Sequence, residues 1–190
     1  MMKELKTSFA MLVLFTIITG FLYPLAITGA AAVLFPYQAG GSLIPDGKRV
    51  IGSKLIGQLF KGPKYFHGRP SFADYDGMNS GGTNLGPTNR KLADQVRMRA
   101  VTVRKVNGLA DGARVPADLV FASGSGLDPH ISLDGALMQA PRVARERKLD
   151  MNLVTDLVMK NSRKSYFNIY GDPLVNVLAL NRALDSSGGK

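Results

Sequence analysis

The run FAMLVLFTIITGFLYPLAITGAAAVLF occupies residues 9–35 and carries no charged side chain in its 27 positions. A bilayer core of about 30 Å needs about 20 helical residues. At a rise of about 1.5 Å per residue, this run reaches about 40 Å. It therefore predicts a transmembrane helix that crosses with some tilt or with one end in the interface.

Small residues and a proline interrupt this run. Gly20, Gly29 and Ala30 would let another helix approach closely, which predicts helix packing in the membrane. Pro24 would break a helix in water, whereas neighbouring helices in a membrane can satisfy the carbonyl that it frees. We therefore expect this helix to have partners.

A cleaved signal peptide is the alternative interpretation of the N-terminus. The start is basic and residues 30–32 are three alanines, which could form a cleavage zone, but an apolar region of about 7–15 residues is typical of signal peptides. The run is much longer, which favours a retained anchor.

Flanking cations predict the orientation of the helix. Lys3 and Lys6 precede it, and no cation follows Phe35 before Lys48. The positive-inside rule then places residues 1–8 in the cytoplasm and residues 36–190 outside it, which is the periplasm in a bacterium with two membranes.

Beyond the predicted helix at 9–35 we expect a linker at 36–47 and one small extracytoplasmic α+β domain at 48–190. Residues 48–60 alternate loosely and predict a strand followed by a turn or short helix. Residues 61–88 hold six glycines, three prolines and four aromatics, which predicts an ordered loop pinned to the core. Residues 115–122 predict a short buried strand.

Periodicity and capping residues predict the helices of this domain. Residues 89–106 place apolar side chains at helical spacing. Ser132 is a structural cap for a helix that Pro141 should break or restart before Leu149. Asp150 should cap a helix at 152–161, while Asp172 and Pro173 should open the last helix as N-cap and first residue.

Composition excludes several chemistries. The chain has no cysteine and two histidines, His67 and His130, so we expect no metal site. Its net charge is +10, and residues 36–190 retain a surplus of nine once Lys3, Lys6 and Glu4 are set aside. An extracytoplasmic position argues against nucleic acid, which favours a solvated face or docking to membrane lipid or an acidic subunit.

Two glycine stretches stand out, SGGTNLGPTN at 80–89 and SGSGLDPH at 123–130. Neither contains a phosphate-binding Walker loop or a nucleophile elbow. A hydrolase that uses Ser123 or Ser125 with His130 remains an alternative.

Two further interpretations of these stretches stay open. In the structural one, Asp128 caps backbone N–H groups and the glycines supply positive φ. In the other, an amide-rich loop binds an anion or nucleotide phosphate, as in a stand-alone anchored module. The candidate loop residues are Ser80, Gly81, Gly82, Thr83, Asn84, Ser123, Gly124, Ser125 and Gly126.

The chain resembles the C subunit of the bacterial potassium-transporting P-type ATPase, the Kdp complex. The resemblance rests on the apolar run and on GSKLIGQLF, YFHGRPSFADYD, NSGGTNLGPTN, VPADLVFASGSGLDPHIS, QAPRVARERKL and VNVLALN.

This resemblance implies a non-catalytic, single-pass accessory subunit in the inner membrane. Its implied partners are a channel-like potassium-translocating subunit, a P-type ATPase subunit and a small single-span subunit. It also implies a catalytic chaperone that raises the nucleotide affinity of the ATPase subunit. ATP would be engaged through that pump subunit, and no cofactor would be bound tightly. The family's glycine stretch resembles the L-S-G-G-Q signature loop of ABC ATPases, which here corresponds to residues 79–83, without the glutamine.

Overall fold

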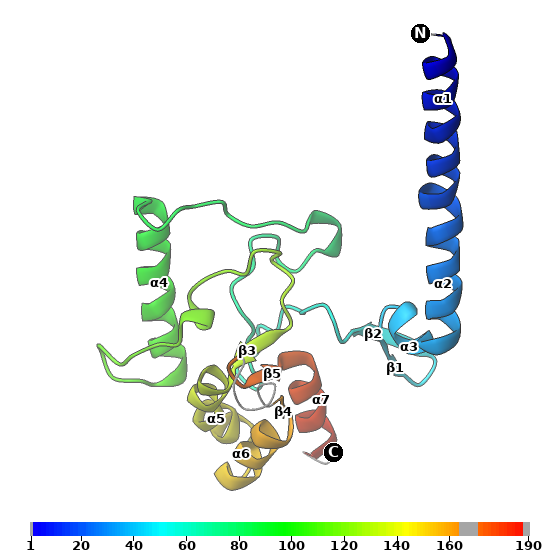
Figure 1. Ribbon diagram of the computed structural model, residues 1–190. Helices are drawn as coiled ribbons and strands as arrows, with labels where there is room; N and C mark the ends of the chain where they lie inside the picture. The colour runs from blue at the N-terminus through cyan, green and yellow to red at the C-terminus, as the bar shows by residue number, and fades with distance from the viewer. Residues whose placement is uncertain (1, 164–170, 188–190) are drawn as a thin grey trace. The chain divides into compact units, whose positions relative to one another are not determined.

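The computed structural model describes residues 2–163 and 171–187 (Figure 1). Its contacts divide the chain into two compact units, an N-terminal unit that ends at Ile51 and a C-terminal unit that begins at Gly52. An apolar helix followed by a small domain of helices and sheet confirms the predicted fold class.

One continuous helix dominates the N-terminal unit. It comprises α1 (Met2–Ile17), the π-helical turn η1 (Ile18–Leu22) and α2 (Tyr23–Leu34). Within the described part of the chain, residues 2–34 form the one helix that is long and apolar enough to cross a membrane.

The π-turn shows how this helix passes Pro24. A proline has no N–H to donate to the carbonyl four residues earlier, and its ring crowds that carbonyl. The N–H of Tyr23 donates instead to the carbonyl of Ile18, five residues back. This wider turn carries the helix through Pro24.

The segment predicted as a linker carries ordered elements. The short helix α3 (Pro36–Ala39) is followed by β1 (Leu43–Asp46), which pairs with β2 (Arg49–Ser53) in a two-stranded sheet. Gly47 turns the chain between the two strands with φ of +59°. The sequence at 48–60 thus forms the predicted strand, and a turn at Ser53 follows it.

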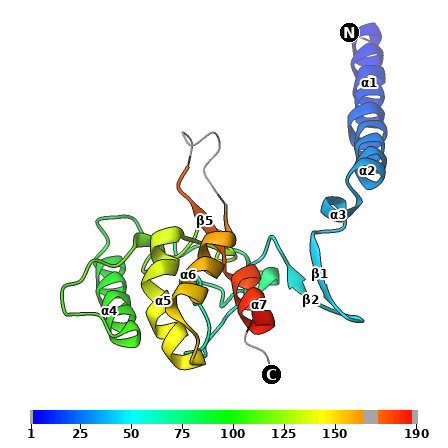
Figure 2. The same ribbon diagram turned by 90° about the horizontal axis from the view of Figure 1, so that it is seen from below.

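In its described residues, the C-terminal unit holds four α-helices and a small antiparallel sheet. The sheet has the order β3-β5-β4, and Ile131 of β3 lies opposite Val175 of β5. In Figure 2, α5 lies between α4 and α6, and α6 lies next to α7. The elements are η2 (Gly77–Asn79), α4 (Arg90–Asn107), η3 (Ala117–Leu119), β3 (His130–Ser132), α5 (Leu133–Arg147), α6 (Met151–Lys160), β4 (Ser162–Arg163), β5 (Leu174–Asn176) and α7 (Val177–Ser187).

Three helices begin where the sequence predicts. Asn89 caps α4 through the N–H of Lys91, and Asp150 caps α6 through the N–H groups of Asn152 and Leu153. Ser132 accepts the N–H of Gly135 at the start of α5. The core beneath these helices is continuous and includes Phe66, Ile131, Ala136, Ala140, Val143, Val154, Val158, Val175, Leu180 and Leu184.

Three other expectations are wrong. Pro141 does not break α5, which runs unbroken to Arg147 because its buried face is held against the core. Residues 115–122 hold the 3₁₀ turn η3 at Ala117–Leu119 in place of the expected strand. The adjacent Leu119 and Val120 are both buried, whereas a strand would send them to opposite faces.

The last helix also begins later than predicted. Residues 174–176 are β5, and α7 starts at Val177, because these residues pair with β3 and β4. Asp172 and Pro173 precede this strand and cap no helix; the carbonyl of Pro173 accepts the N–H of Leu133.

Side-chain amides on the helices hold the long loop at 61–88. Asn181 of α7 accepts the N–H of Phe66 at 2.9 Å and donates to its carbonyl at 3.0 Å. Gln139 of α5 does the same for His67, at 2.8 and 3.1 Å. Each side-chain amide forms the two backbone hydrogen bonds that a neighbouring β-strand would otherwise form. The irregular segment therefore keeps its backbone hydrogen bonds inside the domain.

A buried arginine secures the same loop. Arg142 is 1% exposed, and its guanidinium donates to the carbonyls of Pro63 and Tyr65, to Asn107 of α4 and to Gln139. Burial lowers the pKa of Arg142 to about 10, so the side chain still carries its charge at neutral pH. Arg142 therefore ties α4, α5 and the loop together.

Candidate functional site

The two glycine stretches meet in the C-terminal unit. The N–H of Gly81 donates to the carbonyl of Ser125 at 2.9 Å, and the hydroxyl of Ser80 donates to the same oxygen at 3.2 Å. A Cβ atom added to Gly82 would lie 3.0 Å from the carbonyl oxygen of Gly124. The glycines thus permit a close approach of two backbones that are distant in sequence.

Gly126 has a second reason to be glycine. Its φ of +69° is the left-handed region, and a Cβ atom there would lie 3.0 Å from the carbonyl oxygen of Gly81. Gly81, Gly82 and Gly124 do not have positive φ, so the expectation of positive φ at all four glycines is wrong for these three.

Several polar groups of the 123–130 stretch form hydrogen bonds within the domain. The hydroxyl of Ser125 accepts the N–H of Leu127, and the hydroxyl of Ser71 donates to the carbonyl of Gly126 at 2.7 Å. The carbonyl of Leu127 accepts the N–H of Gly57 at 2.8 Å. These contacts join three segments and are those of a structural junction.

Part of the predicted anion loop lines one small cavity. Its volume is about 210 Å³, and its lining includes Gly82, Thr83, Asn84, Ser123 and Gly124. Small-molecule sites usually measure about 300–1,000 Å³, so this cavity lies below the usual size. Ser80, Gly81, Ser125 and Gly126 are not in the lining.

The cation nearest to this cavity is already engaged. Arg99 of α4 reaches the lining, and its guanidinium donates to the carbonyl of Val120 at 3.0 Å. The structure therefore brings five of the nine predicted loop residues together at a cavity whose arginine also supports the fold.

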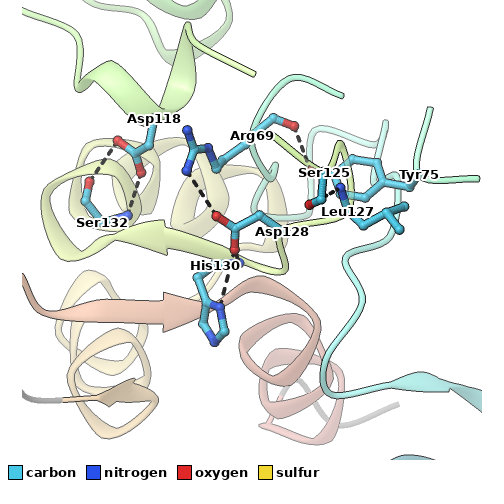
Figure 3. Close-up of polar contacts among 8 residues, drawn as sticks. All are labelled: Arg69, Tyr75, Asp118, Ser125, Leu127, Asp128, His130 and Ser132. Atoms are coloured by element: carbon cyan, nitrogen blue, oxygen red, sulfur yellow. Dashed lines mark hydrogen bonds and ion pairs between the residues drawn. The ribbon is translucent and has the colours of Figure 1, made fainter. Parts of the chain in front are cut away.

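His130 faces Asp128 (Figure 3). Its Nδ1 lies 3.4 Å from Oδ1 of Asp128, which also accepts the backbone N–H of His130 at 3.0 Å. In the described part of the chain, no hydrogen bond joins Ser123 or Ser125 to His130. The geometry does not assemble the nucleophile and base of a serine hydrolase.

Asp128 is the centre of a polar cluster. The guanidinium of Arg69 donates to its Oδ2 at 3.0 Å. Burial on its own would raise the pKa of Asp128, but hydrogen bonds from His130 and Arg69 outweigh it and hold the pKa below its ordinary value of 3.8. Asp128 therefore stays ionised and links β3 to the loop at 61–88.

Tyr75 closes the cluster on the loop side. Its hydroxyl donates to the carbonyl of Arg69 at 2.7 Å (Figure 3), and its ring fills the space that side chains at Gly57 and Gly68 would need. Burial, with the nearby Asp128 charge, raises the pKa of Tyr75 to about 12. Tyr75 has φ of +63°, a strained conformation that the surrounding contacts hold.

Asp118 and Asp128 cover the free edge of β3. Asp118 accepts both the N–H and the hydroxyl of Ser132 (Figure 3), while Asp128 accepts the N–H of His130. His130 and Ser132 are alternate residues of an edge strand. Carboxylates on both amides block the addition of another strand.

A groove of about 820 Å³ opens beside this edge. Charges of both signs line it, including Arg69, Arg114, Asp118, Asp128 and Asp134. Among the described residues, no group of three or more histidine or acidic side chains is placed to hold a metal ion.

Sequence reasoning missed Gln139, Arg142, Asn181 and Asp118. A signal existed for the first three, because each is a polar residue on the apolar face of its helix: Gln139 and Arg142 lie among Ala136, Ala140 and Val143, while Asn181 lies between Val177 and Leu184. Buried polar side chains are expected to hold a partner. The partner of Asp118 could not be found from sequence.

The residues predicted to pack in the membrane lie on the long apolar helix of the N-terminal unit. Gly20 belongs to η1, whereas Pro24, Gly29 and Ala30 belong to α2, and all four are exposed. A Cβ atom at Gly29 would meet nothing within 4 Å in this chain.

The chain combines an apolar helix that is long enough to span a membrane with a small α+β domain, and the glycine loops of that domain form an internal junction. The model of the KdpC family, described as K+-transporting ATPase, c chain, matches residues 5–186. The chain therefore belongs to the KdpC family, the C subunits of the potassium-transporting ATPase.

Curated relatives agree over almost the whole length. The potassium-transporting ATPase KdpC subunit of Rhodospirillum rubrum is 51% identical over 187 residues, which is 97% of this chain and 96% of the relative. The KdpC subunit of Gemmatimonas aurantiaca is 51% identical over 189 residues, 98% of this chain and 94% of the relative. That of Rhodopseudomonas palustris is 47% identical over 201 residues, 98% of both chains.

Proposed function

We propose that this chain is a non-catalytic subunit that assembles and stabilises an ATP-driven potassium uptake pump. The family match over residues 5–186 carries the proposal. Its partners would be the channel-like potassium-translocating subunit, the P-type ATPase subunit and the small single-span subunit.

The helix at Met2–Leu34 supports assembly through the membrane. It is long enough to span, and none of its residues is buried by the rest of the chain. Gly29 and Ala30 lie on it as small exposed residues, where another helix could approach closely. We propose that this strip packs on a helix of a partner subunit.

The glycine junction supports a role without bond breaking. The hydroxyls of Ser80 and Ser125 are used in hydrogen bonds to the chain, and among the described residues His130 is paired with Asp128 rather than with a serine. The domain would thus contribute shape and contacts, while the ATPase subunit performs the chemistry.

The flanking lysines support an extracytoplasmic domain. Lys3 and Lys6 precede the span, so the N-terminus would stay in the cytoplasm. The domain could not then touch cytosolic ATP, and any effect on nucleotide affinity would pass through the partner subunits. Such coupling needs a structural element with two states. Both the domain and the nucleotide site must shift the equilibrium between those states.

Co-purification tests the assembly role. The variants Gly29→Leu and Ala30→Leu should lower the yield of intact complex from detergent, because a leucine keeps the partner helix at a distance. Val33→Leu, an exposed position on the same helix that is already large, is the matched control. Unchanged yield in both test variants would contradict packing at this strip.

Nucleotide kinetics tests the chaperone role. Pump prepared without this chain should hydrolyse ATP with a higher apparent KM than the complete complex. Adding the purified chain back should restore the lower value. An apparent KM that is the same with and without the chain would reject the role in nucleotide affinity and leave the assembly role standing.

A further inference from the structure

Helix α4 presents a cationic and apolar surface that the fold does not use. In both ribbon views it forms one edge of the domain (Figure 1 and Figure 2). Its 18 residues include six basic side chains and one acidic side chain, Asp94. We call the exposed side of α4 the outer face; it comprises Arg90, Lys91, Asp94, Arg97, Met98, Val101 and Lys105.

Two apolar side chains, Met98 and Val101, lie between basic side chains on the outer face. Residues 90, 94, 97, 101 and 105 follow the spacing of three and four that keeps side chains on one side of a helix. Met98 is 64% exposed and Val101 is 61% exposed. Two sizeable apolar side chains therefore stand in water between arginines and lysines.

The cations of the outer face remain in solvent. Asp94 lies 4.0 Å from Arg90 and 3.8 Å from Arg97, but the side chains of these arginines are 95% and 81% exposed. One carboxylate therefore faces four cations along the same surface. Exposed ion pairs of this kind contribute little to stability, so they leave the cations available.

The opposite side of α4 makes the contacts of the fold. Arg99 donates to the carbonyl of Val120, Arg104 donates to that of Ala113, and Asn107 accepts from Arg142. The half-buried Val103 packs against the core. Substitutions on the outer face should therefore leave the domain folded.

We propose that the outer face of α4 binds the surface of an anionic lipid bilayer. A basic side chain close to an anionic membrane surface contributes about 1 kcal/mol. Apolar side chains between the cations can enter the boundary of headgroups and acyl chains, as on interfacial amphipathic helices. The positive charge of the outer face complements the negative charge of an anionic bilayer surface. The apolar side chains at the centre of this face lie along one helix, which suits a planar interface.

The chain itself favours this partner over a free acidic protein. The domain is covalently joined to a helix long enough to span a membrane. This connection keeps the domain near a bilayer surface, where even weak contacts are populated because their effective concentration is high. The inference holds for either side of the membrane and does not depend on the proposed function.

A single labelled cysteine tests the inference, since the chain has no cysteine of its own. Full-length Val101→Cys, carrying an environment-sensitive fluorophore, is reconstituted without other subunits into vesicles of phosphatidylcholine alone or mixed with phosphatidylglycerol. We expect a blue shift and quenching by lipid-borne quenchers in the anionic vesicles only. High salt should weaken both effects. The same label at Ser186→Cys on α7 should show neither.

Charge reversal supplies the matched control. Arg97→Glu with Lys105→Glu should abolish the shift at Val101→Cys. Arg145→Glu with Lys160→Glu, which changes the net charge equally at exposed positions of α5 and α6, should preserve it. The same emission spectrum in both kinds of vesicle would overturn the proposal. An equal loss of the blue shift with both pairs of charge-reversal substitutions would overturn it as well. Protection that arises only when partner subunits are added would also overturn it and make the face a protein interface.

Discussion

Two features of the structure require glycine at position 126. The backbone there is left-handed, and a carbonyl oxygen lies close to the place that a Cβ atom would occupy. Gly126→Ala should lower the free energy of unfolding by about 1–2 kcal/mol, because alanine at positive φ brings its Cβ against the carbonyl. The measurement is urea unfolding of the detergent-solubilised chain.

The matched control for this change is Gly124→Ala, two residues earlier. Gly124 has no positive φ, and a Cβ atom there would meet nothing within 4 Å. Its stability should stay within about 0.5 kcal/mol of the parent. Equal losses at the two positions would show that the backbone geometry at Gly126 is not what requires glycine.

His67 makes the stability of the domain depend on pH. Burial lowers the pKa of His67 below its ordinary value of 6.5, although its Nε2 contacts the carbonyl of Gly62. As pH falls through 6.5, the unfolded chain takes up a proton at His67 before the folded chain does. The free energy of unfolding should therefore decrease until the lowered folded pKa is reached.

The variant His67→Gln isolates this contribution. Its free energy of unfolding should change less than that of the parent between about pH 7 and pH 5, since the titrating group is gone. The comparison uses the slope against pH and not the stability at one pH. Parallel slopes would show that His67 does not titrate differently on folding.

Among the elements of the fold, Arg142 of α5 links the long loop at 61–88 to helix α4. Arg142→Met should lower the free energy of unfolding by about 3 kcal/mol or more, because it leaves the carbonyls of Pro63 and Tyr65 without their donor. Trypsin should then cut faster at Lys61 and Lys64. Arg145→Ala, exposed on the same helix, is the control and should change neither quantity.

The helices were the predictable elements, because local signals define them. Asn89 and Asp150 accept N–H groups in the first turn of α4 and α6, and the apolar spacing of each helix follows directly. The start of α7 was not predictable. Residues 174–176 have no local feature that excludes a helix, and they form a strand because β3 and β4 pair with them.

The site was less predictable than the fold because its contacts cross long stretches of chain. The hydrogen bond from Ser80 to Ser125 spans 45 positions, and that from Phe66 to Asn181 spans 115. Backbone donors and acceptors leave no mark in the sequence. The glycines showed that something unusual occurs at 80–89 and 123–130, but not that the two stretches meet.

At the scale of the whole molecule, the side of the membrane on which the domain lies is open to a direct test. Ser186→Cys, an exposed position on α7, would be the only thiol in the chain. It should react with a membrane-impermeant thiol reagent in intact spheroplasts, because the lysines before the span predict a cytoplasmic N-terminus. Labelling that requires lysis would reverse this topology.

We propose that the glycine junction shapes an accessory subunit and performs no chemistry. Potassium-stimulated ATPase activity per assembled complex, measured for Ser125→Ala, tests it most directly. The hydroxyl of Ser125 accepts the N–H of Leu127, so its loss should cost about 0.5–2 kcal/mol of stability and leave most of the turnover. A complex that assembles with normal yield but has lost turnover by orders of magnitude would contradict the account.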